Sequence, residues 1–239
     1  MEITELKYNW DLLGEKDPMW AILSDPNMKG GKWNEDDFFA TGVRDIATFL
    51  ETSRALDVCI PRGSALDFGC GIGRLTQALA EHFNSVVGSD VSESMIRRAE
   101  ELNRHSDKCQ YRLNTEPHLD CFDDGAFDFC ITFLVLQHMK TEYAMAYIAE
   151  FCRVLRPEGV LLFQIPTTCK VPGAPPPPPD VPGVPPRRSP EGIIEMYATP
   201  LHDVVRLLDD NGLDVIAVRS DGRAGPEFLS HEIWALKGG

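Results

Sequence analysis

The sequence has no long hydrophobic run and little clustered positive charge. No stretch approaches the roughly 18 uncharged apolar residues of a membrane-spanning helix. The chain carries 23 Lys and Arg against 37 Asp and Glu, a net charge of −14, and its tightest basic pair near a loop is Arg187–Arg188. Because such a surface repels phosphate backbones, we expect neither nucleic acid nor a membrane as a partner.

The seven cysteines form no C-x-x-C pair, and their odd number leaves at least one without a partner. Several lie in apolar runs, which is typical of reduced, buried thiols rather than of disulfides or a structural zinc site. The first residues show neither the basic nor the apolar segment of a signal peptide. We therefore expect a cytoplasmic protein with no structural metal.

What is present is an alternation of short apolar segments with segments of helical periodicity. Strands are predicted at residues 64–68, 85–90, 109–113, 127–133, 160–165, 213–218 and 231–236. Helices are predicted after the N-cap residues Asn34 and Ser92, over 74–83, from Thr141 to the RPEG stretch at 156–159, and from Thr199–Pro200 to Gly212. This order predicts an α/β fold with a mainly parallel sheet and helices on both faces.

Ten of the 18 prolines lie between Cys169 and Pro190. The predicted strands on either side belong to one sheet, because residues 191–239 alone offer too small a core for a domain. We therefore expect an insertion rather than a linker. The predicted organisation is an N-terminal helical cap at 1–58 and one domain at 59–239, with the Pro-rich insertion at 170–190.

The most informative stretch is "ALDFGCGIGRLTQAL", in which Gly69, Gly71 and Gly73 stand between a strand and a helix. Glycines permit a tight turn and let the backbone approach a ligand closely, and the helix N-terminus offers unpaired N–H groups. Asp90 ends the next strand, 21 residues after Gly69. An acid at that place accepts hydrogen bonds from ribose hydroxyls, so the pattern predicts a nucleoside site.

Two residues argue against a dinucleotide in this site. The motif G-x-G-x-x-G has its last glycine where this chain has Arg74. Asp67, two residues before the first glycine, fits badly beside a pyrophosphate and well beside an ammonium group. A ligand with a ribose, an amino group and no phosphate is S-adenosylmethionine.

Four segments carry a family resemblance: "LDFGCGIGRLT", "VVGSDVSESMIRRAE", "FDFCITFLVLQHM" and "VLRPEGVLLFQIP". In this order and spacing, over about residues 63 to 166, they resemble the successive motifs of class I S-adenosylmethionine-dependent methyltransferases. The resemblance implies a Rossmann-like, seven-stranded sheet whose last strand is antiparallel. It also implies S-adenosylmethionine as cofactor and methyl transfer to a small-molecule acceptor.

The resemblance further implies a set of cofactor contacts. The methionine end would be lined by Asp67, Gly69, Cys70, Gly71, Gly73, Phe133 and Leu134. The ribose would be held by Asp90, and the adenine would be flanked by Val91 and Met95, with Asn114 and Thr115 near its amino group. Asn114 stands where the family more often has Asp, and core packing is an alternative for Val91 and Met95.

The stretch "LVLQHM" places His138 just after the fourth strand, where acceptor and cofactor would meet. Its near-neutral pKa suits a general base, and the alternative is a contact in the pocket, with Gln137 beside it. Tyr197 and His202 are further candidates for the general base. A metal-assisted mechanism would need clustered ligands, but Asp123–Asp124 is typical of a turn.

The N-terminal segment is dense in aromatic residues, and in the family this region often folds over the cofactor. Trp10 and Trp33 lie outside the helical stripe, so they are predicted to contact cofactor or substrate, with simple packing as the alternative. Aromatic rings also attract a sulfonium cation.

The acceptor is predicted to be a metabolite, sugar or natural-product intermediate, and the sequence does not specify whether O, N, C or S is methylated. Alternatives are a protein that docks partners through polyproline and has a vestigial cofactor site, or an S-adenosylmethionine-binding enzyme with a non-methylating reaction. The Pro-rich insertion leaves the carboxyl end of the fifth strand. It is therefore predicted to be an arm or lid beside the pocket or a homodimer contact, with a surface loop as the alternative.

Overall fold

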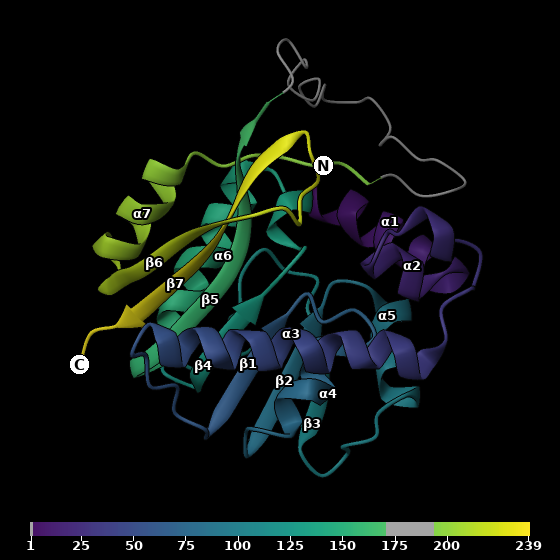
Figure 1. Cartoon of the computed structure of the whole chain (residues 1–239), viewed down its shortest axis with the longest axis horizontal. Helices are drawn as coiled ribbons and strands as arrows, with labels where there is room; N and C mark the ends of the chain where they lie inside the picture. Colours follow the sequence, from purple (N-terminus) through teal and green to yellow (C-terminus); the bar gives the residue numbers. More distant parts are fainter. Residues whose placement is uncertain (1, 171–193) are drawn as a thin grey trace.

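The computed structural model describes residues 2–170 and 194–239, so nearly all of the predicted Pro-rich insertion lies outside the described residues. Seven strands form one sheet in the order β3-β2-β1-β4-β5-β7-β6 (Figure 1). Their bounds are β1 (Ser64–Phe68), β2 (Ser85–Asp90), β3 (Cys109–Leu113), β4 (Phe127–Thr132), β5 (Leu155–Cys169), β6 (Leu213–Asp221) and β7 (Phe228–Lys237). β7 is antiparallel to both of its neighbours, and the pairs among β1 to β5 are parallel. The predicted Rossmann-like α/β sheet with an antiparallel last strand is confirmed.

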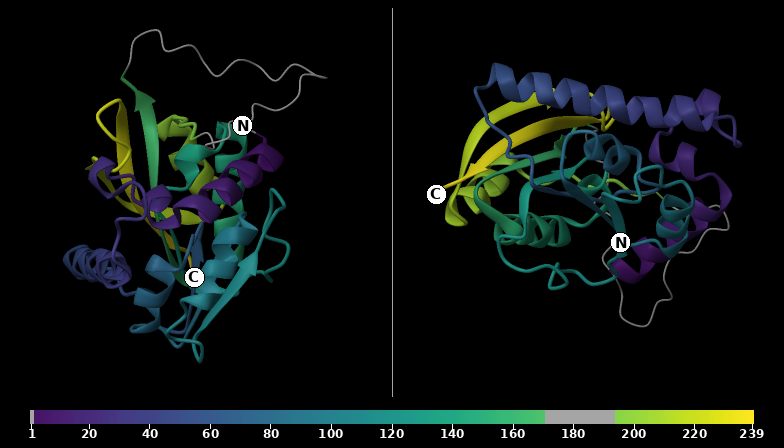
Figure 2. Two further views of the ribbon diagram at one scale, coloured as in Figure 1. Left: turned by 90° about the vertical axis from the view of Figure 1, so that its right-hand side faces the viewer. Right: turned by 90° about the horizontal axis from the view of Figure 1, so that it is seen from below.

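Helices cover both faces of the sheet (Figure 2). Their bounds are α1 (Ile3–Lys16), α2 (Pro18–Ile22), α3 (Glu35–Ala55), α4 (Arg74–Ala80), α5 (Glu93–Glu101), α6 (Thr141–Val154) and α7 (Leu201–Asp210). One core lies under α3 and α4, and the other under α6 and α7. Successive residues of a strand supply opposite cores: Phe129 and Ile131 face α3 and α4, while Cys130 faces α6. This explains why the central strands are continuously apolar.

Two predicted element ends are wrong. The RPEG stretch does not end α6, which stops at Val154, and it already belongs to β5. Arg156 holds it against the start of β4, since its Nη1 atom lies 3.1 Å from a carboxylate oxygen of Asp128. Thr199 is not the N-cap of α7, because the helix begins at Leu201 and Pro200 takes the N-cap position, while the Thr199 N–H donates to the Pro166 carbonyl at 2.9 Å.

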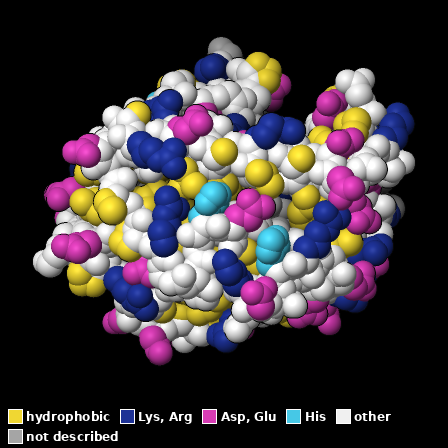
Figure 3. Space-filling model, turned by 60° about the horizontal axis from the view of Figure 1, so that its bottom comes forward, with side chains coloured by type: hydrophobic (Ala, Val, Ile, Leu, Met, Phe, Trp, Pro, Cys, Tyr) yellow, Lys and Arg dark blue, Asp and Glu magenta, His cyan; other side chains and the backbone are white. Residues whose placement is uncertain are grey.

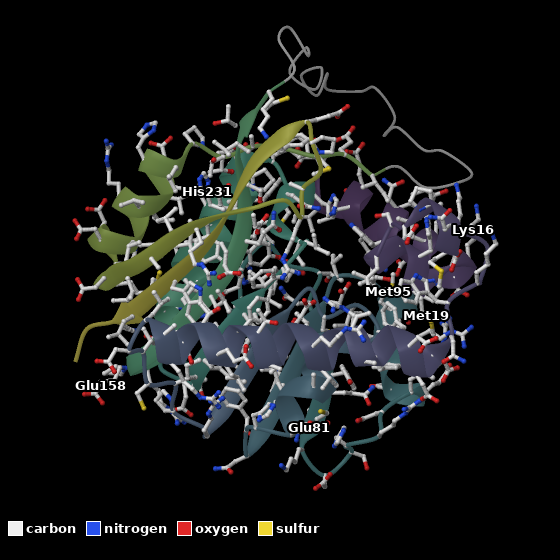
Figure 4. All side chains as sticks on the ribbon, viewed as in Figure 1. Lys16, Met19, Glu81, Met95, Glu158 and His231 are labelled. Atoms are coloured by element: carbon white, nitrogen blue, oxygen red, sulfur yellow. The ribbon has the colours of Figure 1, made fainter. Side chains whose placement is uncertain are left out.

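The N-terminal helices α1 and α2 pack over one end of the sheet, beside α5. The Asp11 carboxylate accepts from the Ser92 hydroxyl at 2.9 Å, which ties α1 to the start of α5. The helices approach closely, since a Cβ added at Gly14 would lie 2.2 Å from the Ser94 hydroxyl. Figure 4 labels Met19 and Met95 on this side, and Glu81 and Glu158 at the opposite end of the strands. The predicted N-terminal helical region is thus present above the carboxyl ends of the strands.

Within residues 2–170 and 194–239, no helix has both the length and the apolar character needed to cross a membrane. On the face drawn in Figure 3, basic and acidic side chains are interspersed.

Candidate active site

A cavity of about 550 Å³ lies at the carboxyl ends of the strands, below α1 and α2. Residues that directly follow strands line it, which is the usual place for a ligand in an open α/β sheet. The predicted site residues that line it are Trp10, Gly69, Gly71, Asp90, Val91, Met95, Asn114, Phe133, Leu134, Gln137 and His138. Given the strand order, the cavity lining divides into an Asp90 end (Gly69, Gly71, Asp90, Val91, Met95, Asn114) and a His138 end (Trp10, Gln137, His138, and the residues Met196 and Arg223, which were not predicted).

The turn after β1 strongly favours glycine at positions 69 and 71. Gly69 and Gly71 have φ of 74° and 54°, in the left-handed region that L side chains rarely adopt. A Cβ at Gly69 would lie 2.2 Å from a Val135 methyl, and one at Gly71 would lie 2.5 Å from Ile22 Cδ1. The turn therefore presents bare backbone to the cavity, with the end of α2 directly above it.

Asp90 faces the glycine turn from the end of β2. Its Oδ2 accepts from the N–H of Gly71 at 2.8 Å, and its Oδ1 accepts from the N–H of Ser92 at 2.9 Å. Burial raises the pKa of Asp90 to about 6, and the backbone donors oppose that rise. Each carboxylate oxygen has two lone pairs, so both oxygens can still accept one further hydrogen bond.

Asp67 is placed differently from the prediction. It is 2% exposed, and its Oδ2 accepts from the Thr76 hydroxyl at 2.6 Å. Burial raises its pKa to about 6, and the Thr76 hydrogen bond opposes the rise. Asp67 thus supports α4 beneath the glycine turn, and it is not among the described residues that line the cavity.

Arg74, which replaces the glycine of a dinucleotide motif, has a structural role. Its guanidinium is 2.6 Å from the Asp45 carboxylate and donates to the Thr41 hydroxyl at 3.2 Å. Both partners belong to α3, and a Cβ at Gly42 would lie 2.2 Å from the Arg74 carbonyl oxygen. Arg74 therefore fastens α4 to α3 where the two helices cross closely.

Four other predicted residues lie outside the cavity lining in the described part of the chain: Cys70, Gly73, Thr115 and Trp33. A Cβ at Gly73 would lie 2.3 Å from the Tyr111 hydroxyl, so this glycine serves packing against β3. Cys70 is buried, and its sulfur lies against Gly88 of β2. Trp33 packs edge-on against Phe38, with ring centroids 5.8 Å apart. Met95 fits both of its predicted roles, because it is buried in the core below α1 and also lines the cavity.

Asn114 shapes the end of the cavity beyond β3. Its Nδ2 donates to the carbonyl oxygens of Glu116 and His118 at 3.2 and 3.1 Å. Because carbonyls only accept, the amide orientation is fixed, and Oδ1 remains an acceptor.

His138 is buried at the other end, in a short helical turn at Leu136–His138. Its Nδ1 is 2.8 Å from the Glu195 carbonyl oxygen, so Nδ1 carries the proton, and Nε2 accepts from the Gln137 amide at 3.2 Å. Burial lowers the pKa of His138 to about 4, so the ring is neutral at pH 7. The Trp10 ring packs edge-on to it at 5.3 Å. This geometry favours the alternative, a pocket contact, over the predicted general base.

Behind His138 a fully buried amide, Gln164 of β5, connects the segments. Its Nε2 donates to Gln137 Oε1 at 3.2 Å and to the Ser230 hydroxyl at 2.6 Å. Its Oε1 accepts from the N–H of Leu134 at 3.1 Å, and Leu134 holds a positive φ of 63°. Gln164 therefore fixes the turn that follows β4, and it also positions the Gln137 side chain at the His138 end.

The further candidates for the general base do not line the cavity. His202 is exposed on α7 beside Asp203, whereas the Tyr197 N–H donates to the Gln137 carbonyl at 2.7 Å and supports the pocket from outside. Asp124 pairs with Arg153 at 2.7 Å in the turn before β4. Among the described residues, no group of three His, Cys, Asp or Glu is placed to hold a metal ion.

Sequence reasoning missed a group of cavity residues: Ile22, Ile194, Met196, Arg223, Ala224 and Gly225. Arg223 lies in the β6–β7 connection, between the last two predicted strands. No local motif identifies these residues, because they reach the cavity through the long-range order of the sheet.

Three comparisons bear on this architecture. The family described as "Methyltransferase domain" matches residues 66–163. YqeM of Bacillus subtilis, a protein named as a methyltransferase, is 30% identical over 52% of this chain and 51% of its own length. The 2-methyl-6-phytyl-1,4-hydroquinone methyltransferase of Synechocystis is 32% identical over 45% of this chain and 33% of its own length.

The chain thus spans about half of the length of the first of these curated relatives and a third of the second. Among solved structures, magnesium protoporphyrin IX methyltransferase of Synechocystis, with bound S-adenosylhomocysteine, has a TM-score of 0.67 at 20% identity, over 99% of this chain and all of that one. This likeness establishes the fold. Residues 66–163 thus match a methyltransferase domain, and the sheet order with the glycine turn facing Asp90 gives the chain the fold of class I S-adenosylmethionine-dependent methyltransferases.

Proposed function

We propose that the protein transfers a methyl group from S-adenosylmethionine to a small-molecule acceptor. The observation that carries the proposal is the Asp90 end of the cavity, where bare glycine backbone and a carboxylate with unused lone pairs face the same space. Relatives named as a 2-methyl-6-phytyl-1,4-hydroquinone methyltransferase and a ubiquinone biosynthesis O-methyltransferase support this acceptor class.

The residues present fit the cofactor. Asp90 would accept from the ribose hydroxyls, Asn114 Oδ1 would accept from the adenine amino group, and Val91 and Met95 supply apolar surface for the ring. The methionine portion would lie along the turn at Gly69 and Gly71, which lines the cavity together with Leu134. Asp67 would affect the methionine portion only indirectly, by supporting the glycine turn.

When bound, the cofactor supplies an electrophilic methyl group on a sulfonium sulfur. The chain's contribution is to bind and orient the acceptor and to exclude water, which can account for much of a methyl-transfer rate. Both ring nitrogens of the neutral His138 are engaged within the protein, Nδ1 with the Glu195 carbonyl and Nε2 with the Gln137 amide, and its lowered pKa makes it a weak proton acceptor. We therefore expect an acceptor atom that attacks without first losing a proton to a strong base.

The test is incubation of the protein with methyl-labelled S-adenosylmethionine and fractionated small-molecule extracts, followed by mass spectrometry. Labelled products that are absent with the Asp90→Ala variant would support the proposal. Release of S-adenosylhomocysteine without any labelled small molecule would contradict it.

A further inference from the structure

We propose that Arg223 forms an anion-recognition site in the acceptor pocket, and that the methyl acceptor is an apolar molecule carrying a carboxylate or phosphate group. This inference rests on the proposed function and names its substrate class. Within the described part of the chain, Arg223 is the one lysine or arginine that lines the cavity. It lies in the loop between β6 and β7, at the carboxyl edge of the sheet and at the His138 end.

The guanidinium is held in place by aromatic rings. Its Cζ lies 5.1 Å from the ring centroid of Phe133 and 5.5 Å from that of Phe49, and these two rings stack on each other at 4.5 Å. Because guanidinium N–H bonds lie in the plane of the group, stacking on a ring leaves the donors free for other partners. The loop itself is anchored, since the N–H of Arg223 donates to the Asp221 carboxylate at 3.0 Å.

The donors of Arg223 are only partly used within the molecule. Two of them reach a single oxygen of Asp45, both at 3.4 Å, which is a long contact. Asp45 is already committed to Arg74 at 2.6 Å, so two guanidiniums share one carboxylate. In the part of the chain that the structure describes, the remaining N–H groups of Arg223 have no protein acceptor. An anion bound in the cavity would accept charge-assisted hydrogen bonds from these N–H groups.

Apart from Gln137 and His138, whose polar atoms are hydrogen-bonded within the protein, the side chains around Arg223 at the His138 end are apolar. Residues around it include Leu6, Trp10, Phe133, Val135, Ile194 and Met196. Among the described residues, the two carboxylates that line the cavity have other hydrogen-bond partners. Asp90 accepts from the N–H of Gly71 in the glycine turn, and Asp25 accepts from the N–H of Asn27. A hydrophobic body with one anionic group matches this arrangement, because the body is desolvated by the lining while the charge meets a positioned cation.

The experiment measures binding of phenylacetate, phenyl phosphate and the uncharged phenylacetamide by calorimetry and ligand-observed NMR. Each is titrated into the full chain with and without saturating S-adenosylhomocysteine. We expect at least one anion to bind about 10- to 100-fold more tightly than the amide, as a charge-assisted hydrogen bond implies. Which anion is preferred separates a carboxylate from a phosphate site.

The Arg223→Met variant should lose this preference while retaining its affinity for S-adenosylhomocysteine within about twofold. The matched control is Arg219→Met, since Arg219 lies on β6, shortly before the loop that carries Arg223, but pairs with Thr52 and Glu232 away from the cavity. The proposal is overturned if no anion outbinds the amide, or if Arg223→Met keeps the preference. It is also overturned if Arg223→Met loses S-adenosylhomocysteine, which would assign the guanidinium to the cofactor. Failure of the wild type to bind S-adenosylhomocysteine would instead contradict the proposed function. The titrations without S-adenosylhomocysteine would still measure the preference for the anions over the amide.

Discussion

The two ends of the cavity are built in different ways. The Asp90 end consists of backbone and short side chains that follow neighbouring strands, and its key contact joins Gly71 to Asp90 directly. The His138 end is assembled by buried side chains from β5, β7 and the turn after β4, with Gln164 at the junction. Changes at the first end should therefore weaken a ligand, whereas changes at the second should first weaken the fold.

The largest effect is expected at the His138 end, for Gln164→Leu. Loss of this amide leaves the Leu134 N–H, the Gln137 amide and the Ser230 hydroxyl unpaired in a buried site, and should lower the free energy of unfolding by roughly 2–4 kcal/mol. Urea denaturation measures the change. Gln110→Leu, the same replacement at an exposed position of β3, is the control and should change stability little. Equal stabilities for the two variants would mean that the buried network contributes nothing.

At the other end, Asp90→Ala should leave the fold largely intact and weaken S-adenosylhomocysteine binding by roughly 1–3 kcal/mol, because the ribose hydroxyls lose a charged acceptor. Calorimetry compares it with Asp107→Ala, an exposed carboxylate in the loop before β3. Unchanged affinity would remove Asp90 from the site. A drop in stability as large as that of Gln164→Leu would abolish the contrast between the two ends.

Asp67 should influence stability through pH. Its folded pKa of about 6 lies above the unfolded value of about 3.9, so the folded state binds more protons between these values. Its contribution to stability is therefore present below about pH 4 and is lost as pH rises toward 6. Relative to wild type, Asp67→Asn should gain roughly 1–2 kcal/mol between pH 4 and pH 7, measured by urea denaturation at both values. A pH-independent difference would refute the buried-charge assignment.

The smallest effect concerns the titration of Asp90. Because its pKa is raised to about 6, protonation below that value should remove the charged acceptor and weaken S-adenosylhomocysteine up to about tenfold between pH 7 and pH 5. Asp90→Asn should bind more weakly than wild type at pH 7 and show a flat profile over the same range. A parallel decline in both proteins would place the titrating group elsewhere.

The same contrast explains what the sequence could predict. The strands and the Asp90 end depend on local patterns, and Gly69, Gly71 and Asp90 lie where those patterns placed them. Asp67 was misplaced because spacing alone does not show whether a side chain turns toward the ligand or toward Thr76. Arg223 was missed because Phe49, Phe133 and Asp45 reach it only after the sheet has formed, and no short segment of sequence records those contacts.

The most direct test of the central claim is a calorimetric titration of the wild-type chain with S-adenosylhomocysteine, repeated with Asp90→Ala. We predict saturable binding at one site per chain, weakened in the variant by the loss of the Asp90 acceptor. Absence of saturable heat in the wild type, or identical isotherms for the two proteins, would contradict the assignment of this cavity as the cofactor site.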